Sequence, residues 1–226
     1  MTKKQRNSKN IEHTNPNGTQ SRTGQERKRA LIEGTINSLA KRGVAGTTIS
    51  TICEASGSSR GLITHYFGSK EALLAQALQH VYSTVSLSIY RQMDKPELTA
   101  RERLTLFPEA LFSRSVFTQK NRSVFLCLWH ETRFNKIVRT TNQKLYRGYV
   151  LKMEELFFQA AIENTSNYAG LKEKSKAAAI GFISLSDGLW LGMSIHDRLI
   201  DNASAIGHCK KFIDSQFEIL HKNTNG

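Results

Sequence analysis

Apolar residues recur every three or four positions through most of the chain, and this spacing predicts helices throughout. The first clear case is the segment 25–42, in which Leu31, Ile32 and Leu39 fall on one apolar stripe. Gly43 stands where a helix commonly ends, because glycine adopts the left-handed backbone conformation of a C-cap at low cost. A helix is therefore expected from residue 25 to residue 42.

Two short helices are predicted next. The first has Thr47 or Thr48 as its N-cap and Gly57 at its end. The second runs from 59 to 66, and the Gly68-Ser69 pair interrupts it. Both are only about two turns long, so tertiary packing must stabilise them.

Longer helices follow. They are predicted at 70–93, 98–118, 121–136, 138–165, 170–196 and 202–221. No segment shows the alternation of a strand, so we expect an all-α protein. The pattern divides it into a small N-terminal head of three helices and a larger C-terminal helical bundle, the body, joined by the helix at 70–93.

Charge is concentrated at the start of the chain. The 226 residues carry a formal net charge of +13. Residues 1–30 hold eight Lys or Arg side chains and only two Glu. We expect 1–23 to be a disordered basic arm, because this stretch is polar and lacks an apolar segment. Such an arm favours a polyanionic partner, or it is a solvated tail that only aids solubility.

Composition also bears on location and chemistry. The N-terminus does not read as a signal peptide, and no run of 18 apolar residues predicts a transmembrane helix. Cys53, Cys127 and Cys209 lie far apart without a CxxC pair, which fits small core residues in a reducing cytoplasm. We therefore expect a cytoplasmic protein without a metal or other cofactor.

The positions of the histidines in this sequence do not indicate an enzyme. His130-Glu131 and His196-Asp197 are adjacent pairs, and neighbouring side chains diverge on a helix, so neither pair forms a site alone. The sequence has no GxSxG, phosphate-binding loop or metal-ligand spacing.

The head has the pattern of a helix-turn-helix motif, in which two short helices meet at a glycine-containing turn and a third braces them. Ile63 and Phe67 anchor the second short helix, whose other side is polar. Arg60 can donate to a guanine edge or a phosphate, and Gly61 allows close backbone approach. The capped helix starts at Thr48 and Ser69 offer N–H groups to phosphates. An ordinary helical corner is the alternative.

The stretch TTISTICEASGSSRGLITHYFGSKEALL resembles the signature of the TetR family of transcriptional regulators. In that family a capping Thr, an Ile-x-x-Ile-Ala core, an Ala-Gly turn, a Ser-Lys-Gly start and a His-Phe-x-x-Lys ending have this spacing. The resemblance spans about residues 25–75 and implies DNA contacts, carried over by position. These are Thr48, Ser58, Ser59, Arg60, Gly61, Thr64, His65, Tyr66 and Lys70.

Four positions depart from the common pattern. Cys53 stands for Ala and Ser58 for Val, and both replacements are small. Thr64 stands for Tyr and Tyr66 for His, a version similar to the BetI-type branch, which comprises choline-responsive repressors of glycine betaine synthesis. The segments 124–150 and 177–195, which include SDGLWLG, also resemble the BetI-type C-terminal domain.

The body contains most of the aromatic residues, and an aromatic stripe at helical spacing is usually core. A pocket between helices of a bundle is nevertheless the expected place for a small effector. Trp129 and Trp190 would suit a quaternary ammonium ion through cation–π attraction, and Asp187 or Glu131 could supply a counter-charge.

Small residues mark one side of the predicted helix 170–196. They are Ala177, Ala178, Gly181, Ser184, Gly188 and Gly192. Their spacing permits close helix approach, either in internal packing or in a dimer. The resemblance implies that this helix and the next form a four-helix interface between two subunits. The predicted domains are then the arm at 1–23, a helix-turn-helix DNA-binding domain at 24–70, and an effector-binding and dimerisation domain at 71–226.

The sequence thus predicts a homodimeric repressor that binds a palindromic operator in double-stranded DNA and is released by a small effector. The resemblance implies a BetI-like regulator that responds to choline or a related quaternary ammonium. A TetR-type regulator of a drug, a fatty acid or another metabolite is one alternative. A non-specific DNA-binding or adaptor protein is the other.

Overall fold

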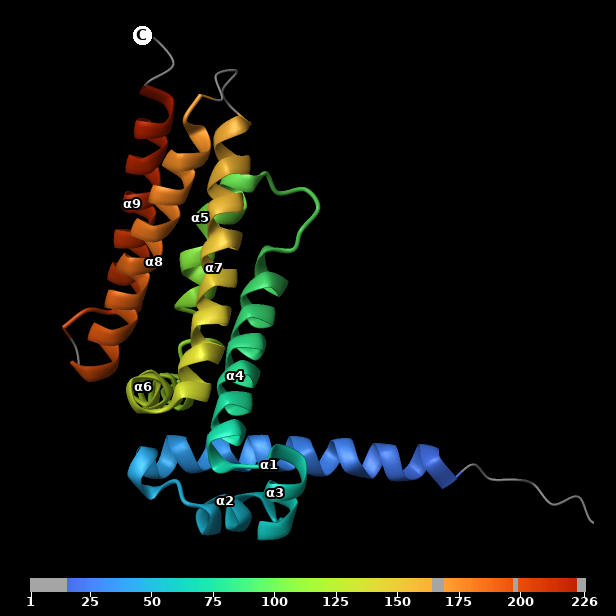
Figure 1. Cartoon of the computed structure of the whole chain (residues 1–226). Helices are drawn as coiled ribbons and strands as arrows, with labels where there is room; N and C mark the ends of the chain where they lie inside the picture. The colour runs from blue at the N-terminus through green and yellow to red at the C-terminus, as the bar shows by residue number, and fades with distance from the viewer. Residues whose placement is uncertain (1–15, 164–168, 197–198, 223–226) are drawn as a thin grey trace, which may run out of the picture.

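The computed structural model describes residues 16–163, 169–196 and 199–222, with the side chains of 16–22, 221 and 222 left undescribed. In these segments the chain is helical (Figure 1). The helices are α1 (Pro16–Gly46), α2 (Ile49–Ser56), α3 (Arg60–Phe67), α4 (Lys70–Met93), α5 (Ala100–Leu111), α6 (Gln119–Phe134), α7 (Lys136–Ile162), α8 (Leu171–Ile195) and α9 (Asn202–Lys222).

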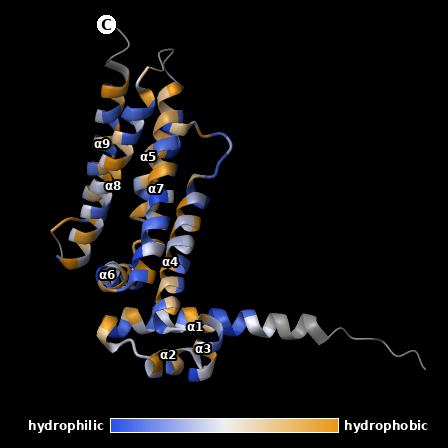
Figure 2. Ribbon diagram, in the orientation of Figure 1, coloured by the Kyte–Doolittle hydropathy of each residue, from blue (hydrophilic) through white to orange (hydrophobic). Residues whose placement is uncertain are grey.

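The body is a bundle set on top of the head. α4, α5, α7, α8 and α9 run side by side, whereas α1 lies across the lower end of the bundle (Figure 1). α1 packs against α2, α4 and α6, and α7 packs against α4, α5, α6 and α8. Apolar residues gather where helices meet, while α1 is hydrophilic over residues 23–29 (Figure 2).

Two hydrophobic cores share the helices that join head and body. The head core consists of Leu31, Ile52, Ile63 and Leu73, one from each of α1 to α4. The body core includes Leu39 of α1 and continues along α4 into the bundle. The boundary predicted at residue 70 therefore coincides with the start of a helix that contributes to both cores.

Most predicted helices of the head are confirmed. α2 and α3 have Thr48 and Ser59 as their N-caps, and Gly57 ends α2 with φ 62°. Gly43 departs from helical geometry with φ 67°, so the regular part of α1 ends where predicted, although a further short helical turn follows it. Local cap and breaker residues thus set these ends.

The N-terminal end of α1 differs from the prediction. The helix begins at Pro16, nine residues earlier than expected, so residues 16–23 of the predicted disordered arm are helical. Proline fits the first turn of a helix, because its fixed φ suits that position and the N–H it lacks would have no helical partner there. The rest of the predicted arm, residues 1–15, lies outside the described residues.

The predicted helix 98–118 is also wrong in part, because α5 ends at Leu111. Phe112 and Val116 are both buried, and a turn lets both side chains reach the core. Asn202 donates a hydrogen bond to the carbonyl of Phe112 over 2.7 Å and so satisfies a group at the open helix end. Thr118 then caps α6 by accepting from the Asn121 amide.

α8 is long and apolar enough to cross a membrane by length and composition, alone among the described helices. In this fold it packs against α7 and α9, and Phe182, Ile183 and Trp190 on its inner side belong to the body core. A long helix with an apolar inner side is also typical of a bundle in a protein that crosses no membrane.

Candidate DNA-binding surface and ligand pocket

A reciprocal capping box fixes the start of α2. The Thr48 side chain accepts a hydrogen bond from the Thr51 amide over 3.2 Å, and the Thr51 hydroxyl accepts from the Thr48 amide over 2.9 Å. At the other end, the Gly57 N–H donates to the carbonyl of Cys53. Both ends of α2 therefore have partners for groups that a short helix leaves open.

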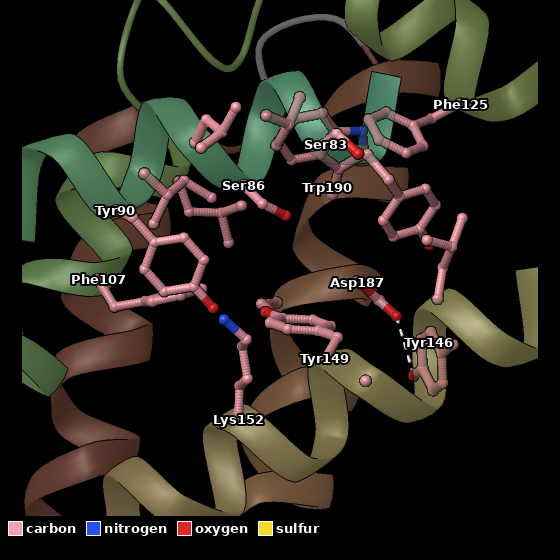
Figure 3. Close-up of a pocket in the computed structure, with 18 of the residues that line it drawn as sticks. Ser83, Ser86, Tyr90, Phe107, Phe125, Tyr146, Tyr149, Lys152, Asp187 and Trp190 are labelled. Atoms are coloured by element: carbon pink, nitrogen blue, oxygen red, sulfur yellow. Dashed lines mark hydrogen bonds between the residues drawn. The ribbon is translucent and has the colours of Figure 1, made fainter. Parts of the chain in front are cut away.

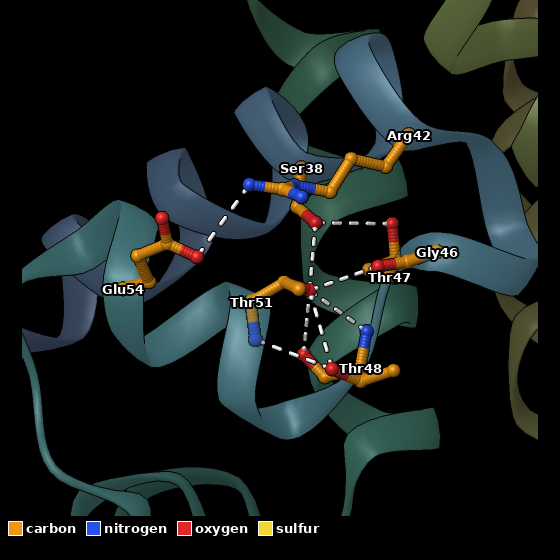
Figure 4. A network of polar contacts seen from close by, with 7 residues as sticks. All are labelled: Ser38, Arg42, Gly46, Thr47, Thr48, Thr51 and Glu54. Carbon is orange, nitrogen blue, oxygen red and sulfur yellow. Dashed lines mark hydrogen bonds and ion pairs between the residues drawn. The ribbon is translucent and has the colours of Figure 1, made fainter.

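A buried polar network attaches α2 to α1 (Figure 4). The hydroxyl of Ser38 lies 3.2 Å from that of Thr47 and 3.1 Å from that of Thr51. At the surface, the guanidinium of Arg42 lies 3.5 Å from the carboxylate of Glu54. The Thr47 hydroxyl also contacts the carbonyl of Gly43, and that of Thr51 the carbonyl of Gly46, so side-chain and backbone groups together hold α2 against α1.

α1 and α2 also approach closely at a glycine. A Cβ at Gly34 would lie 2.7 Å from the Cβ of Ser56 and 3.0 Å from its backbone nitrogen. No side chain larger than hydrogen fits there without moving α2. The sequence pattern did not single out Gly34, because the close approach depends on tertiary packing.

α3 presents a polar face on the outside of the head. Ile63 is buried, and the Phe67 ring is partly buried with the Lys28 ammonium 5.7 Å from its centroid. Of the predicted DNA contacts, the exposed ones are Thr48, Ser59, Arg60, Gly61, Thr64 and His65. Ser58, Tyr66 and Lys70 are partly buried. The anchor on one side of α3 leaves its opposite side available for a groove of DNA.

Tyr66 is held in place by its neighbours. Its ring meets that of His65 edge to face with 4.8 Å between centroids, and it packs against Phe67 in the same way. A Cβ at Gly24 would come within 3.6 Å of the Tyr66 hydroxyl, so α1 passes beside this ring. The C-terminal end of α3 is therefore a small aromatic cluster that rests on α1.

A cavity of about 600 Å³ lies inside the body, between α4, α5, α6, α7 and α8 (Figure 3). This volume lies within the usual range for small-molecule sites. Aromatic rings dominate its wall. They come from Tyr82, Tyr90, Phe107, Phe125, Trp129, Tyr146, Tyr149 and Trp190. Phe125 and Trp190 meet edge to face, 5.8 Å apart.

Asp187 of α8 is the one carboxylate among the described residues that line this cavity. The Tyr146 hydroxyl donates a hydrogen bond to its Oδ2 over 3.1 Å. Burial disfavours the charged form and raises the pKa of Asp187 to about 6, although the hydrogen bond from Tyr146 acts in the opposite direction. Burial also raises the pKa of Tyr146 to about 12, so its hydroxyl stays protonated as a donor.

The structure brings three of the four predicted effector residues together. Trp129, Asp187 and Trp190 line the cavity, but Glu131 does not. Glu131 lies two positions after Trp129 and therefore about 200° around α6. Its side chain shares a face with Cys127, whose sulfur lies 3.8 Å from the carbonyl of Leu39 on α1. The structure therefore places Glu131 outside the wall of this cavity and leaves Asp187 as the predicted counter-charge.

The sequence interpretation missed most of the α4 wall. Tyr82, Ser86 and Tyr90 lie four residues apart, which places them on one face of α4 and in the cavity wall. Two tyrosines flanking a serine at this spacing are an unusual stripe for a pure core helix, and this was the available signal. Lys152 of α7 was also missed, since a lone lysine in a charged segment carries no signal.

The small residues on α8 lie on two sides of the helix. Ala178 is buried, and a Cβ at Gly181 would lie 2.7 Å from the Phe212 ring of α9, so these two positions pack within the subunit. Other positions of the stripe face outward. The outward face consists of Ala177, Ile180, Ser184, Gly188, Leu191 and Ile195. We call these six residues the α8 face.

Comparison with known proteins assigns both parts of the chain. The model for bacterial regulatory proteins of the tetR family matches residues 31–77, and the model for the C-terminal part of BetI-type transcriptional repressors matches residues 100–218. The chain belongs to the TetR family. Within it, the body is of the BetI type. The protein is thus a DNA-binding transcriptional regulator and not an enzyme, which confirms the sequence interpretation.

Curated relatives carry the same body type. This TetR-family regulator is 24% identical over 192 residues to the HTH-type transcriptional regulator BetI of Burkholderia mallei, which covers 83% of this chain and 92% of that protein. It is 25% identical over 192 residues to BetI of Burkholderia cenocepacia, with the same coverage.

Solved structures agree with the fold. A transcriptional regulator from Pseudomonas aeruginosa PAO1 superposes with a TM-score of 0.76 at 27% identity, covering 88% of this chain and 93% of that one. A regulator from Saccharomonospora viridis in complex with choline has a TM-score of 0.68 at 23% identity, covering 84% and 96%. The all-α TetR fold with a helix-turn-helix head is therefore confirmed.

Proposed function

We propose that this TetR-family regulator is a cytoplasmic repressor that binds a palindromic operator as a homodimer and is released by a small organic cation such as choline. The observation that carries the proposal is the cavity in which a single carboxylate, Asp187, is surrounded by aromatic rings. Aromatic faces attract cations, most strongly where water is excluded. A quaternary ammonium needs no hydrogen-bond acceptors, so rings and one carboxylate suffice to hold it.

The proposed reading element is α3. Arg60 at its first turn is exposed and can reach a guanine edge or a phosphate, while Gly61 leaves room for the backbone to approach the DNA. The N-terminal ends of α2 and α4 then face phosphates with open N–H groups. The proposed contacts are Thr48, Ser58, Ser59, Arg60, Gly61, Thr64, His65, Tyr66 and Lys70.

The proposed dimer uses the α8 face together with α9. Ile180, Leu191 and Ile195 expose between 40% and 56% of their surface, and a row of apolar side chains of this kind is costly to leave in water. Gly188 between them has open space where a Cβ would stand, so a partner helix can approach closely. A two-fold dimer would place two α3 helices about one DNA turn apart, roughly 34–36 Å.

Coupling between effector and DNA would run through α4. Tyr82 and Tyr90 line the cavity from this helix, while Leu73 at its start belongs to the head core. An effector that prefers one position of α4 shifts the population toward one spacing of the two heads. A coupling of about 1–3 kcal/mol changes operator affinity about 5- to 150-fold.

Two observations outside the cavity support choline as the proposed effector. The relatives from Burkholderia are named BetI, and the regulator from Saccharomonospora viridis was solved in complex with choline. At 23% identity the latter likeness concerns the fold, so the aromatic surroundings of Asp187 remain the main argument for a cation. A regulator of the same type with a different ligand is the second candidate.

The test is operator release. DNA from upstream of the gene is titrated with the protein, with and without choline or betaine aldehyde, and binding is followed by gel shift or fluorescence anisotropy. Choline should release the wild-type protein, whereas Asp187→Asn should bind the same DNA and fail to be released. Release by an uncharged ligand alone would refute the cation proposal, and equal binding to unrelated DNA would indicate a non-specific binder.

A further inference from the structure

The cavity has two chemically different ends. Asp187, Tyr146 and Tyr82 lie at one end, and the charge of Asp187 acts on both tyrosines. At the other end, the Lys152 ammonium lies 4.4 Å from the centroid of the Tyr90 ring. In Figure 3, Tyr149 lies between Asp187 and Lys152.

The helices that form the walls give the distance between these ends. Tyr146 and Lys152 are six residues apart on α7, and Tyr82 and Tyr90 are eight apart on α4. At 1.5 Å per residue, the walls extend over about 9–12 Å. A single trimethylammonium group fills one end of such a cavity and leaves the other end empty.

The charges are also unequal. Among the described residues of the wall, one carboxylate faces two ammonium groups, those of Lys144 and Lys152. No carboxylate in the described part of the chain lies within 4.0 Å of either lysine. A ligand with only positive charge would satisfy Asp187 but would also be repelled by the lysines.

Lys152 is the better placed of the two to receive an anion. Its ammonium is held over Tyr90, whereas no such contact is present for Lys144. Lys152 also borders a second cavity of about 400 Å³, which shares Tyr90, Phe107 and Lys152 with the first. The second cavity carries acids as well as Arg103, whose guanidinium donates to the carbonyls of Leu98 and Lys95. Lys152 is therefore the cation at the junction of the two cavities, and no carboxylate of the described residues lies within 4.0 Å of its ammonium.

We propose, building on the effector site of the preceding section, that the effector is a zwitterion: a quaternary ammonium held at Asp187 and a carboxylate or phosphate held at Lys152. The buried carboxylate and rings take the weakly hydrated ammonium. Lys152 is exposed at the open side, so the strongly hydrated anion keeps part of its water. Opposite charges at the two ends also fix the direction in which the ligand binds.

The test compares three ligands of one head group on the full-length protein. Choline lacks an anion, carnitine carries a carboxylate and phosphocholine a phosphate. Dissociation constants come from calorimetry, and operator release is measured alongside. At least one zwitterion should bind about two- to fivefold more tightly than choline, since a partly exposed ion pair contributes up to about 1 kcal/mol. The tighter of the two identifies the anionic group.

Lys152→Met keeps the stem that packs on Tyr90 and removes the charge. It should lower the affinity for the zwitterion about two- to fivefold and leave that for choline unchanged or slightly higher. Lys152→Arg should restore most of the preference, and Lys144→Met should retain it. Choline binding as tightly as both zwitterions, or an unchanged preference in Lys152→Met, would overturn the inference. If none of the three ligands binds, the proposed function itself is wrong.

Discussion

The imidazole Nε2 of His80 on α4 lies 3.0 Å from the carboxylate of Glu33 on α1. The other carboxylate oxygen of Glu33 lies 3.9 Å from the ammonium of Lys120 at the start of α6. One acid of the head helix thus contacts two helices of the body, just where α1 crosses beneath them (Figure 1). This contact lies between the cavity wall on α4 and the head, so it sits on the route that a shift of α4 would take.

Removing this charge should weaken coupling without touching the cavity. In Glu33→Gln we expect operator affinity to fall about two- to fivefold, because a partly exposed ion pair contributes up to about 1 kcal/mol. The ratio of operator affinities with and without effector should also shrink, while the dissociation constant of the effector stays as in the wild type. Glu97→Gln, an exposed loop residue, is the matched control. An unchanged release ratio would show that Glu33 plays no part in coupling.

Arg60 should carry sequence preference at the DNA. We expect Arg60→Ala to lower operator affinity by about 1–3 kcal/mol and to relax the preference at one base pair if the contact is to a base edge. If the contact is to phosphate, affinity falls equally on all sequences and the slope of log K against log salt decreases by about one. Anisotropy titrations at several salt concentrations separate the two. Arg114→Ala, exposed in the turn after α5, should behave as the wild type.

The close contact between Gly34 and Ser56 allows a prediction about the stability of the head. In Gly34→Ala the new Cβ would lie 2.7 Å from that of Ser56, so α2 must move away from α1. We expect a loss of about 1–2 kcal/mol of stability, since overpacking costs more than the gain in helix propensity, and a marked loss of operator binding. Thermal denaturation and anisotropy measure the two effects.

The matched control for this substitution is Gly207→Ala on α9, where a new Cβ meets open space. This variant should be as stable as the wild type or more so. Adding Ser56→Gly to Gly34→Ala removes the closest contact and should restore part of the lost stability. A stable Gly34→Ala variant with full operator affinity would mean that α1 and α2 are not held as closely as described.

The α8 face should determine the oligomeric state. We expect Ile180→Glu combined with Leu191→Glu to convert a dimer into monomers, because two carboxylates per subunit would be buried without partners. Light scattering after size-exclusion chromatography measures this, and operator affinity should fall with it. Leu151→Glu changes an exposed apolar residue of α7 outside this face and should leave the dimer intact. A dimer that survives the double substitution would place the interface elsewhere.

The head could be predicted from sequence because its ends are set by local chemistry. Thr48 and Ser69 cap helices with their own side chains, and Gly57 ends one through its backbone freedom. The end of α5 could not be predicted in this way. It depends on Phe112 and Val116 reaching a core built by distant helices, and on Asn202 from α9 satisfying the last carbonyl.

The cavity was predictable only in part for a similar reason. Trp129, Asp187 and Trp190 were found because an acid and large rings stand out in an apolar helix. The position of Glu131 outside the cavity wall could not be predicted, because its direction around α6 cannot be known until the neighbours of α6 are known. Lys152 owes its significance to Tyr90, which comes from a helix about 60 residues earlier in the chain.

The buried carboxylate of Asp187 makes stability and binding depend on pH in opposite senses. Its pKa is about 6 in the folded protein against 3.8 for the ordinary group, so the folded state holds this proton more tightly. Without effector, the contribution of this group to stability is full below pH 4 and is lost as the pH rises to about 6, by about 1–3 kcal/mol. Asp187→Asn keeps an acceptor for Tyr146 but does not ionise. It should therefore be more stable than the wild type at pH 7.5, and the difference should vanish near pH 4.5.

A cation binds the ionised form of Asp187, so the affinity for the cation rises with pH whereas stability falls. The affinity of the wild type for choline should rise between pH 5 and pH 7 and then level off, whereas Asp187→Asn should bind choline weakly at every pH. Differential scanning fluorimetry across this range measures stability, and calorimetry measures the affinity. A wild type that loses no stability relative to Asp187→Asn between pH 4.5 and pH 7.5 would show that Asp187 is solvated. A carboxylate that water already solvates would gain little free energy from binding a cation, and the cation proposal would lose its support.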